Sequence, residues 1–147
     1  MKLLRVFLLL SAMMAFVACS NESEDYSYTG ALPIPQNLAY ELIKQQLGDK
    51  QLNEVDIYVS IDMLSAKTKV VSMGSEDIIS PDCDSWLFFV DEMPLIANWG
   101  HPCKYIFVDK TGNVFAYERT MFPTEPSMEK MKLLNRADVW MDMMRNK

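Results

Sequence analysis

His101 and Cys103 are the residues of this 147-residue chain whose types and spacing most directly suggest catalysis. A thiol and an imidazole two positions apart could act as the nucleophile and the base of a cysteine hydrolase. Pro102 stiffens the backbone between them, however, and the sequence identifies no donors for an oxyanion. We therefore expect a protein that is not an enzyme and that needs no cofactor.

The same stretch contains side chains that could bind a metal ion. Asp91, Glu92, His101 and Cys103 offer ligand types that suit zinc. No local pair with CxxC or HxxxH spacing accompanies them, and such a pair is what makes a zinc site recognisable in a sequence. We therefore expect no metal site here.

A third interpretation of the segment 91–103 is structural, and we favour it. The segment is longer than the roughly two to five residues that usually join hairpin strands, and long loops often have functions. Trp99 would pin the segment to the sheet edge, and His101 would hydrogen-bond the backbone as a fixed corner. The segment could then present a surface to a protein partner, with Asn98, Trp99, His101 and Cys103 as candidate binding residues.

Cys83 and Cys103 form an even pair that an oxidising compartment could join in a disulfide. If strands at 86–90 and 104–109 are antiparallel neighbours, the two cysteines lie about 17–20 Å apart, at opposite ends of the strand pair. Bridged Cα atoms lie within roughly 7 Å of each other. The sequence therefore does not decide between free thiols and a disulfide, and a disulfide would require the two strands to be parallel or bent.

Cys19 has a different chemical context. Lys2 and Arg5 precede an uncharged and mainly apolar run over residues 6–18. The run is shorter than the roughly 20 residues of a membrane-spanning helix, and it suits a secretory signal peptide. Residues 16–19, FVAC, resemble the lipobox of bacterial lipoproteins, in which the cysteine is acylated and the chain is cut before it.

The resemblance to lipoproteins implies a division of the chain into three parts. Residues 1–18 would be the signal peptide, residues 19–34 an acidic flexible tether, and residues 35–147 a single domain. Residues 20–25 of the tether are too polar to form a core, and they are similar to the acidic stretch of surface lipoproteins from Bacteroides-type bacteria. We expect a cell-envelope protein held in the outer membrane by its lipid and exposed at the surface.

The charge of the chain excludes one class of partner. Residues 1–18 contain two of the 14 basic residues and no acidic ones, so the mature chain would have 12 basic and 20 acidic residues. An acidic domain without a basic patch repels the phosphates of nucleic acids. We expect contact with the membrane through the lipid, and a protein partner that is a peptidase or an envelope complex.

Hydrophobic periodicity predicts an α+β domain: an antiparallel sheet of about four strands, with an N-terminal and a C-terminal helix packed on it. The run 86–90 is apolar throughout, so we expect a central strand covered on both faces. The other predicted elements are a helix over 37–47 that stops at Gly48, strands over 56–62, 67–72, 104–109 and 114–119, and a helix over 127–144.

A second resemblance involves residues 86–108, in which WLFFVD is followed by NWGHPCKYIFV. This stretch resembles a motif of small secreted bacterial modules, and in some proteins the region ahead of a caspase-like or other cysteine peptidase domain. The resemblance implies an accessory domain without catalytic residues. We therefore expect a binding or accessory module, with a propeptide-like inhibitor of a cysteine peptidase as the alternative.

Overall fold

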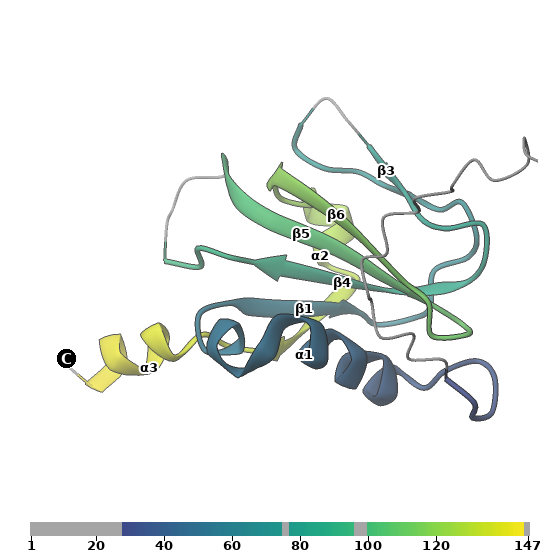
Figure 1. The fold of residues 1–147 in the computed structure, drawn as a ribbon. Helices are drawn as coiled ribbons and strands as arrows, with labels where there is room; N and C mark the ends of the chain where they lie inside the picture. Colours follow the sequence, from purple (N-terminus) through teal and green to yellow (C-terminus); the bar gives the residue numbers. More distant parts are fainter. Residues whose placement is uncertain (1–27, 75–76, 96–99, 146–147) are drawn as a thin grey trace, which may run out of the picture.

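The computed structural model describes residues 28–74, 77–95 and 100–145 (Figure 1). Its helices are α1 (Gln36–Leu52), α2 (Glu125–Met128) and α3 (Asp138–Arg145). Its strands are β1 (Asp56–Ser60), β2 (Lys69–Val70), β3 (Ile78–Ile79), β4 (Ser85–Asp91), β5 (Gly100–Asp109), β6 (Val114–Met121) and β7 (Met131–Asn135). None of the helices within these ranges is long and apolar enough to cross a membrane.

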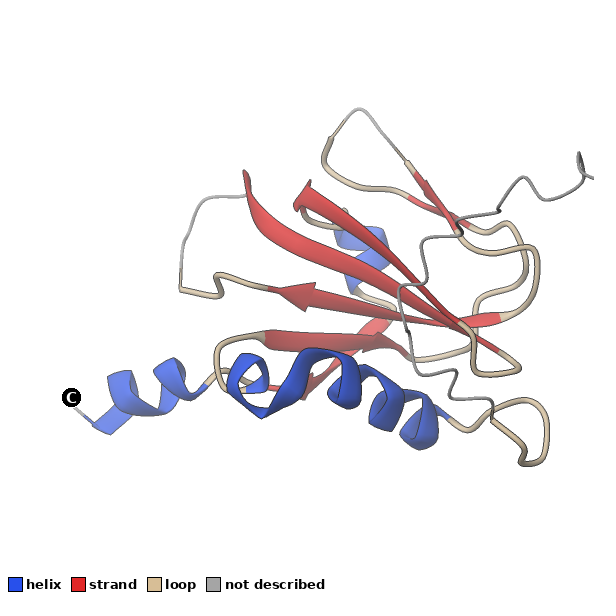
Figure 2. Ribbon diagram, viewed as in Figure 1, coloured by secondary structure: helices blue, strands red, loops and turns tan. Residues whose placement is uncertain are grey.

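The strands form two antiparallel sheets (Figure 2). One sheet has five strands in the order β6-β5-β4-β1-β7, and the other pairs β2 with β3. The predicted α+β class and the antiparallel sheet are therefore confirmed, whereas the prediction of about four strands was too low. β4 lies at the centre of the larger sheet, and its side chains are buried on both faces, as the apolar run 86–90 predicted.

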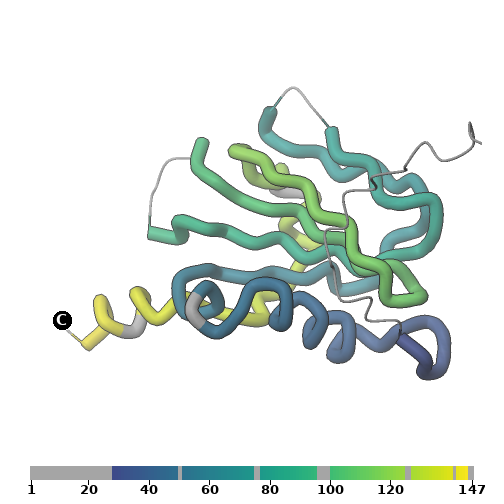
Figure 3. Tube along the Cα trace, in the orientation of Figure 1, coloured from purple at the N-terminus to yellow at the C-terminus, as the bar shows by residue number. Residues whose placement is uncertain are grey.

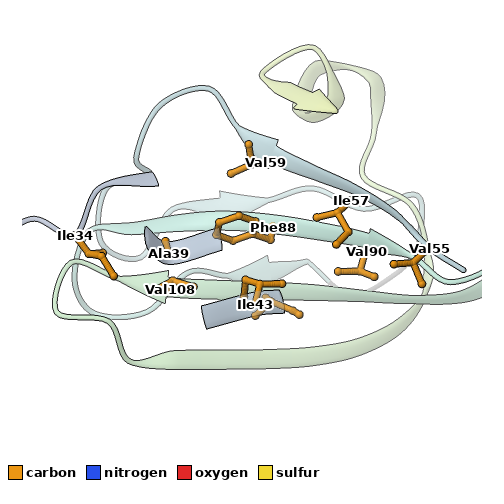
Figure 4. Close-up of a cluster of buried hydrophobic side chains, with 10 residues drawn as sticks. Ile34, Ala39, Ile43, Val55, Ile57, Val59, Phe88, Val90 and Val108 are labelled. Atoms are coloured by element: carbon orange, nitrogen blue, oxygen red, sulfur yellow. The ribbon is translucent and has the colours of Figure 1, made fainter. Parts of the chain in front are cut away.

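The first face of the large sheet is covered by α1. Ala39 and Ile43 of this helix are fully buried against the strands (Figure 4). The indole Nε1 of Trp86 donates to the carbonyl of Ile34 at 2.9 Å, which fixes the chain where it enters the helix. The strand side chains of this core are Ile57, Val59, Phe88, Val90, Ile106 and Val108.

Gly48 interrupts α1 without ending it. Its backbone angles, φ 71° and ψ 160°, are not helical, and a positive φ of this kind favours glycine. The chain then resumes helical geometry and ends the helix at Leu52. The predicted stop at Gly48 therefore marks a kink within the helix.

The second face of the large sheet is covered by the β2–β3 pair, by loops and by α2. Phe89 is fully buried at its centre, with ring centroids 5.1 Å from Tyr105 and 4.9 Å from Phe122. Beside this core β1 ends at Ser60, two residues earlier than predicted, and Ile61 is exposed. The buried members of the second core are Val70, Ile78, Leu87, Phe89, Cys103, Tyr105 and Phe107.

The predicted helix over 127–144 is wrong. The chain forms the short helix α2, then β7, then α3, because the outer edge of β1 pairs antiparallel with β7. Asn135 ends this strand, since its Nδ2 donates to the carbonyls of Leu52 and Val55, both at 2.8 Å. Tertiary pairing here overrides the helical pattern. α3 consequently projects beyond the sheet at the end of the chain (Figures 1 and 3).

Asp109 holds the predicted turn between β5 and β6. Its Oδ1 accepts hydrogen bonds from the backbone and hydroxyl of Thr111 at 2.8 and 2.6 Å and from the backbone of Asn113 at 3.0 Å. Burial alone would raise the pKa of Asp109, but these hydrogen bonds outweigh it and lower the pKa below its ordinary value of 3.8.

Replacing Asp109 with alanine should lower the free energy of unfolding by about 2 kcal/mol at neutral pH. Because the folded pKa is depressed, the contribution is complete above the unfolded pKa of about 3.8 and is lost as the pH falls through the folded value. Urea unfolding at pH 7 and at about pH 2.5 tests this. The difference between the two proteins should shrink in acid, and Asp62→Ala, at an exposed carboxylate, should cost little at either pH. A difference that stays constant would contradict the assignment.

Candidate functional site

The segment between β4 and β5 is shorter than the sequence suggested. β4 continues to Asp91 and β5 begins at Gly100, so His101 and Cys103 lie on a strand and the connection is limited to 92–99. A β-bulge marks the start of β5: the three steps from Gly100 to Cys103 lie opposite the two steps from Met121 to Arg119 on β6. Asn98 and Trp99, two of the candidate binding residues, lie outside the described residues.

A buried contact between His101 and Asp91 lies where the segment 92–99 meets β4 and β5. Nε2 of His101 lies 2.8 Å from Oδ1 of Asp91, and the two side chains are 6% and 8% exposed. The same carboxylate oxygen accepts the backbone N–H of Met93 at 2.9 Å. The imidazole also packs edge-on against Phe122, with ring centroids 4.8 Å apart. The pair therefore joins the end of β4 to the start of β5.

Cys103 is buried beside this pair and is only 1% exposed. Its Sγ donates to the carbonyl of Met121 at 3.4 Å, and the hydroxyl of Tyr105 donates to the same carbonyl at 2.8 Å. Burial is the main cause that raises the pKa of the Cys103 thiol to about 12, and the carboxylates of Asp91 and Glu92 contribute to this rise. The thiol is therefore protonated near neutral pH, which does not suit a nucleophile.

Alkylation by iodoacetamide at pH 8 should distinguish the two cysteines of the domain. We expect Cys103 to react at least about tenfold more slowly than the half-buried Cys83, because its thiolate forms only after local opening. Peptide mass spectrometry over a time course measures both rates, and in denaturant the two rates should become similar. Equal rates in the folded protein would show that Cys103 is reactive and would reopen the hydrolase interpretation.

Cys83 and Cys103 are both free thiols. β4 and β5 pair antiparallel, with Ser85 opposite Asp109 and Asp91 opposite Cys103. Cys83 precedes β4 and so lies at the other end of the strand pair from Cys103. The parallel or bent arrangement that a disulfide requires is therefore not formed.

Charged groups lie on the other side of the strands from the buried pair of His101 and Asp91. Nζ of Lys104 is 2.8 Å from Oε1 of Glu92, and Nε2 of Gln51 in α1 donates to the same oxygen at 3.3 Å. An open pocket of about 340 Å³ lies here, lined by Glu92, Pro102, Cys103, Lys104, Glu118, Arg119 and Thr120. Of the four suggested zinc ligands, Glu92 is therefore paired with a lysine. Among the described residues no three histidine, cysteine or carboxylate side chains are arranged to hold a metal ion.

Sequence reasoning missed three contributors to the site. Met121 and Phe122 approach because β6 pairs with β5, and Gln51 approaches because α1 crosses the sheet. No local spacing in the sequence indicates these contacts.

Comparison of the chain with protein-family models, with curated proteins and with solved structures found no match. Interpretation of the site therefore depends on its geometry.

Proposed function

We propose that this protein is a lipid-anchored, non-catalytic module of the cell envelope that binds a protein partner through the segment 92–99. The observation that supports this proposal is that the polar groups at both ends of the segment are engaged in internal contacts. These contacts fix both ends of the segment in place, and His101 and Cys103 are too buried to reach a substrate. The contacts are His101 with Asp91, Cys103 with Met121, and Glu92 with Lys104.

The segment has apolar side chains for a partner to cover. Met93 and Leu95 are each 39% exposed immediately after the fixed end of β4. Apolar and aromatic anchors at the centre of an interface provide much of its binding energy. We assign that aromatic role to Trp99, with Asn98 beside it. His101 and Cys103 are buried, so in this proposal they position the segment and do not contact the partner.

The lipid anchor in this proposal is Cys19, after removal of residues 1–18. The support is the lipobox resemblance of residues 16–19 and the polar stretch that follows them. These residues lie outside the described part of the chain. An acylated cysteine would hold the acidic domain at the outer membrane, facing outward, without a basic surface.

A narrower candidate names the partner as a cysteine peptidase that the protein restrains. Residues 86–108 resemble the region ahead of such peptidases, and the way these residues fold favours this candidate. These residues include the paired strands β4 and β5 and the segment 92–99 that connects them, so the motif contains the proposed binding segment.

Photo-crosslinking tests the binding surface. A crosslinking amino acid at Leu95 should capture a discrete partner on cells of the native host, and Trp99→Ala should remove the adduct. The same probe at Phe115, which is similarly exposed at 38% on β6, should capture none. Equal adducts from both positions, or an adduct unaffected by Trp99→Ala, would contradict the assignment. If the adduct contains a cysteine peptidase, the purified protein should slow that enzyme.

A further inference from the structure

A crevice of about 150 Å³ lies between the second face of the large sheet and the elements that cover it. Its sheet side comes from β1, β4 and β7, and its covering side comes from the chain around β2, from α2 and from the turn after α2. The lining residues are Ser60, Leu64, Thr68, Lys69, Val70, Leu87, Ser127, Lys130 and Met131. The crevice shares no lining residue with the pocket beside the segment 92–99.

The interior of the crevice is mainly apolar. Leu64, Val70, Leu87 and Met131 belong to the second core, and Val70 and Leu87 are almost completely buried. An apolar cavity of about this volume can take up a molecule the size of benzene. The crevice can therefore accept a small apolar body without rearrangement of the core.

The hydroxyl groups around the crevice are partly used by the protein. Oγ of Ser60 accepts the backbone N–H of Leu87 at 3.1 Å. Oγ1 of Thr68 donates to the carbonyl of Ser65 at 2.7 Å. These bonds hold the sheet and the covering loop in place. The charge selectivity of the crevice therefore depends on its lysines.

The two lysines of the lining differ in their pairing. Nζ of Lys69 forms an ion pair with Asp77. Lys130 forms no ion pair with any of the described residues, and its backbone carbonyl accepts the N–H of Ile61 at 2.8 Å, which fixes the start of its side chain beside β1. An ammonium group at the border of an apolar crevice favours a ligand with an anionic head and an apolar body.

We propose that this crevice binds a small carboxylate whose apolar body is about the size of a benzene ring or a short alkyl chain. The apolar body contacts Leu64, Val70 and Leu87, and the carboxylate faces Lys130. The pairing of Lys69 with Asp77 leaves one positive charge for one carboxylate. The site is separate from the proposed partner surface and does not depend on it.

Methyl NMR on the full chain tests the site, with benzoate and hexanoate as probes. Both acids should shift the methyl signals of Leu64, Val70, Leu87 and Met131 in a saturable manner, and should raise the melting temperature with increasing concentration. Methyl signals of Val59 and Val108, on the first face, should not move. Benzyl alcohol should bind more weakly than benzoate, and benzylamine should bind least.

Variants separate the contributions of charge and volume. Lys130→Met should weaken benzoate about fivefold and leave benzyl alcohol unchanged, whereas Lys132→Met, at an exposed lysine of β7, should change neither. Leu64→Phe should fill the crevice and abolish binding, and Val70→Leu provides a smaller filling change if that variant does not fold. The absence of methyl shifts with either acid, benzylamine binding as tight as benzoate, or unchanged benzoate affinity in Lys130→Met would overturn the proposal.

Discussion

Asp91→Ala should lower the free energy of unfolding by about 3 kcal/mol, the largest loss of stability we expect from any single polar substitution at the site. The variant removes the acceptor of two donors, Nε2 of His101 and the backbone N–H of Met93. The histidine is buried, so water cannot replace the lost contact unless the ends of β4 and β5 separate beside the segment 92–99. For a domain of this size the loss corresponds to a fall in melting temperature of roughly 10 °C.

The neighbouring carboxylate provides a matched control. Glu92 forms an ion pair with Lys104, but both side chains are more than 20% exposed, so Glu92→Ala should cost only about 1 kcal/mol. A double-mutant cycle of Asp91→Ala with His101→Ala should give a coupling energy of at least about 1 kcal/mol. If the two carboxylates cost the same, or if Asp91 and His101 show no coupling, the pair does not hold the segment as described.

The sheet was largely predictable because its signals are local. The uninterrupted apolar run Trp86–Val90 indicated the central strand, and the turn residues Lys110–Asn113 indicated the β5–β6 hairpin. The C-terminal part was not predictable in this way. Residues 131–135 have spacing that suits a helix, but they pair with β1 because its outer edge is open. This contact depends on the rest of the sheet, which no local window of sequence contains.

The site was predictable in composition and not in arrangement. The sequence identified Asp91, His101 and Cys103 as a group, and the structure does bring them together at the ends of β4 and β5. Their roles depend on the bulge in β5 and on burial beneath Phe122, which directs the histidine to the carboxylate and the thiol to a backbone carbonyl. The same residue types would suit catalysis if they were exposed.

Cys19→Ala should abolish lipid attachment to the outer membrane, which is the largest functional effect we expect. The domain is acidic, and the proposed attachment depends on the acyl chains alone, since no polybasic segment would assist them. In membrane fractions of the native host, the wild-type protein should sediment with the envelope. The variant should be absent from the outer-membrane fraction, and should be found either in the soluble fraction or, as an unprocessed precursor that keeps residues 1–18, in the inner-membrane fraction. Cys83→Ala is the control, because it removes a cysteine of the domain and should leave attachment intact.

Labelling with a palmitate analogue, followed by intact-mass analysis, tests the proposed anchor most directly. The account predicts a mature chain that begins at Cys19, contains acyl groups on that residue, and takes up label in the wild type but not in Cys19→Ala. A mature protein that keeps residues 1–18 and an unmodified Cys19 thiol would contradict the anchor, and with it the envelope location proposed for the binding segment.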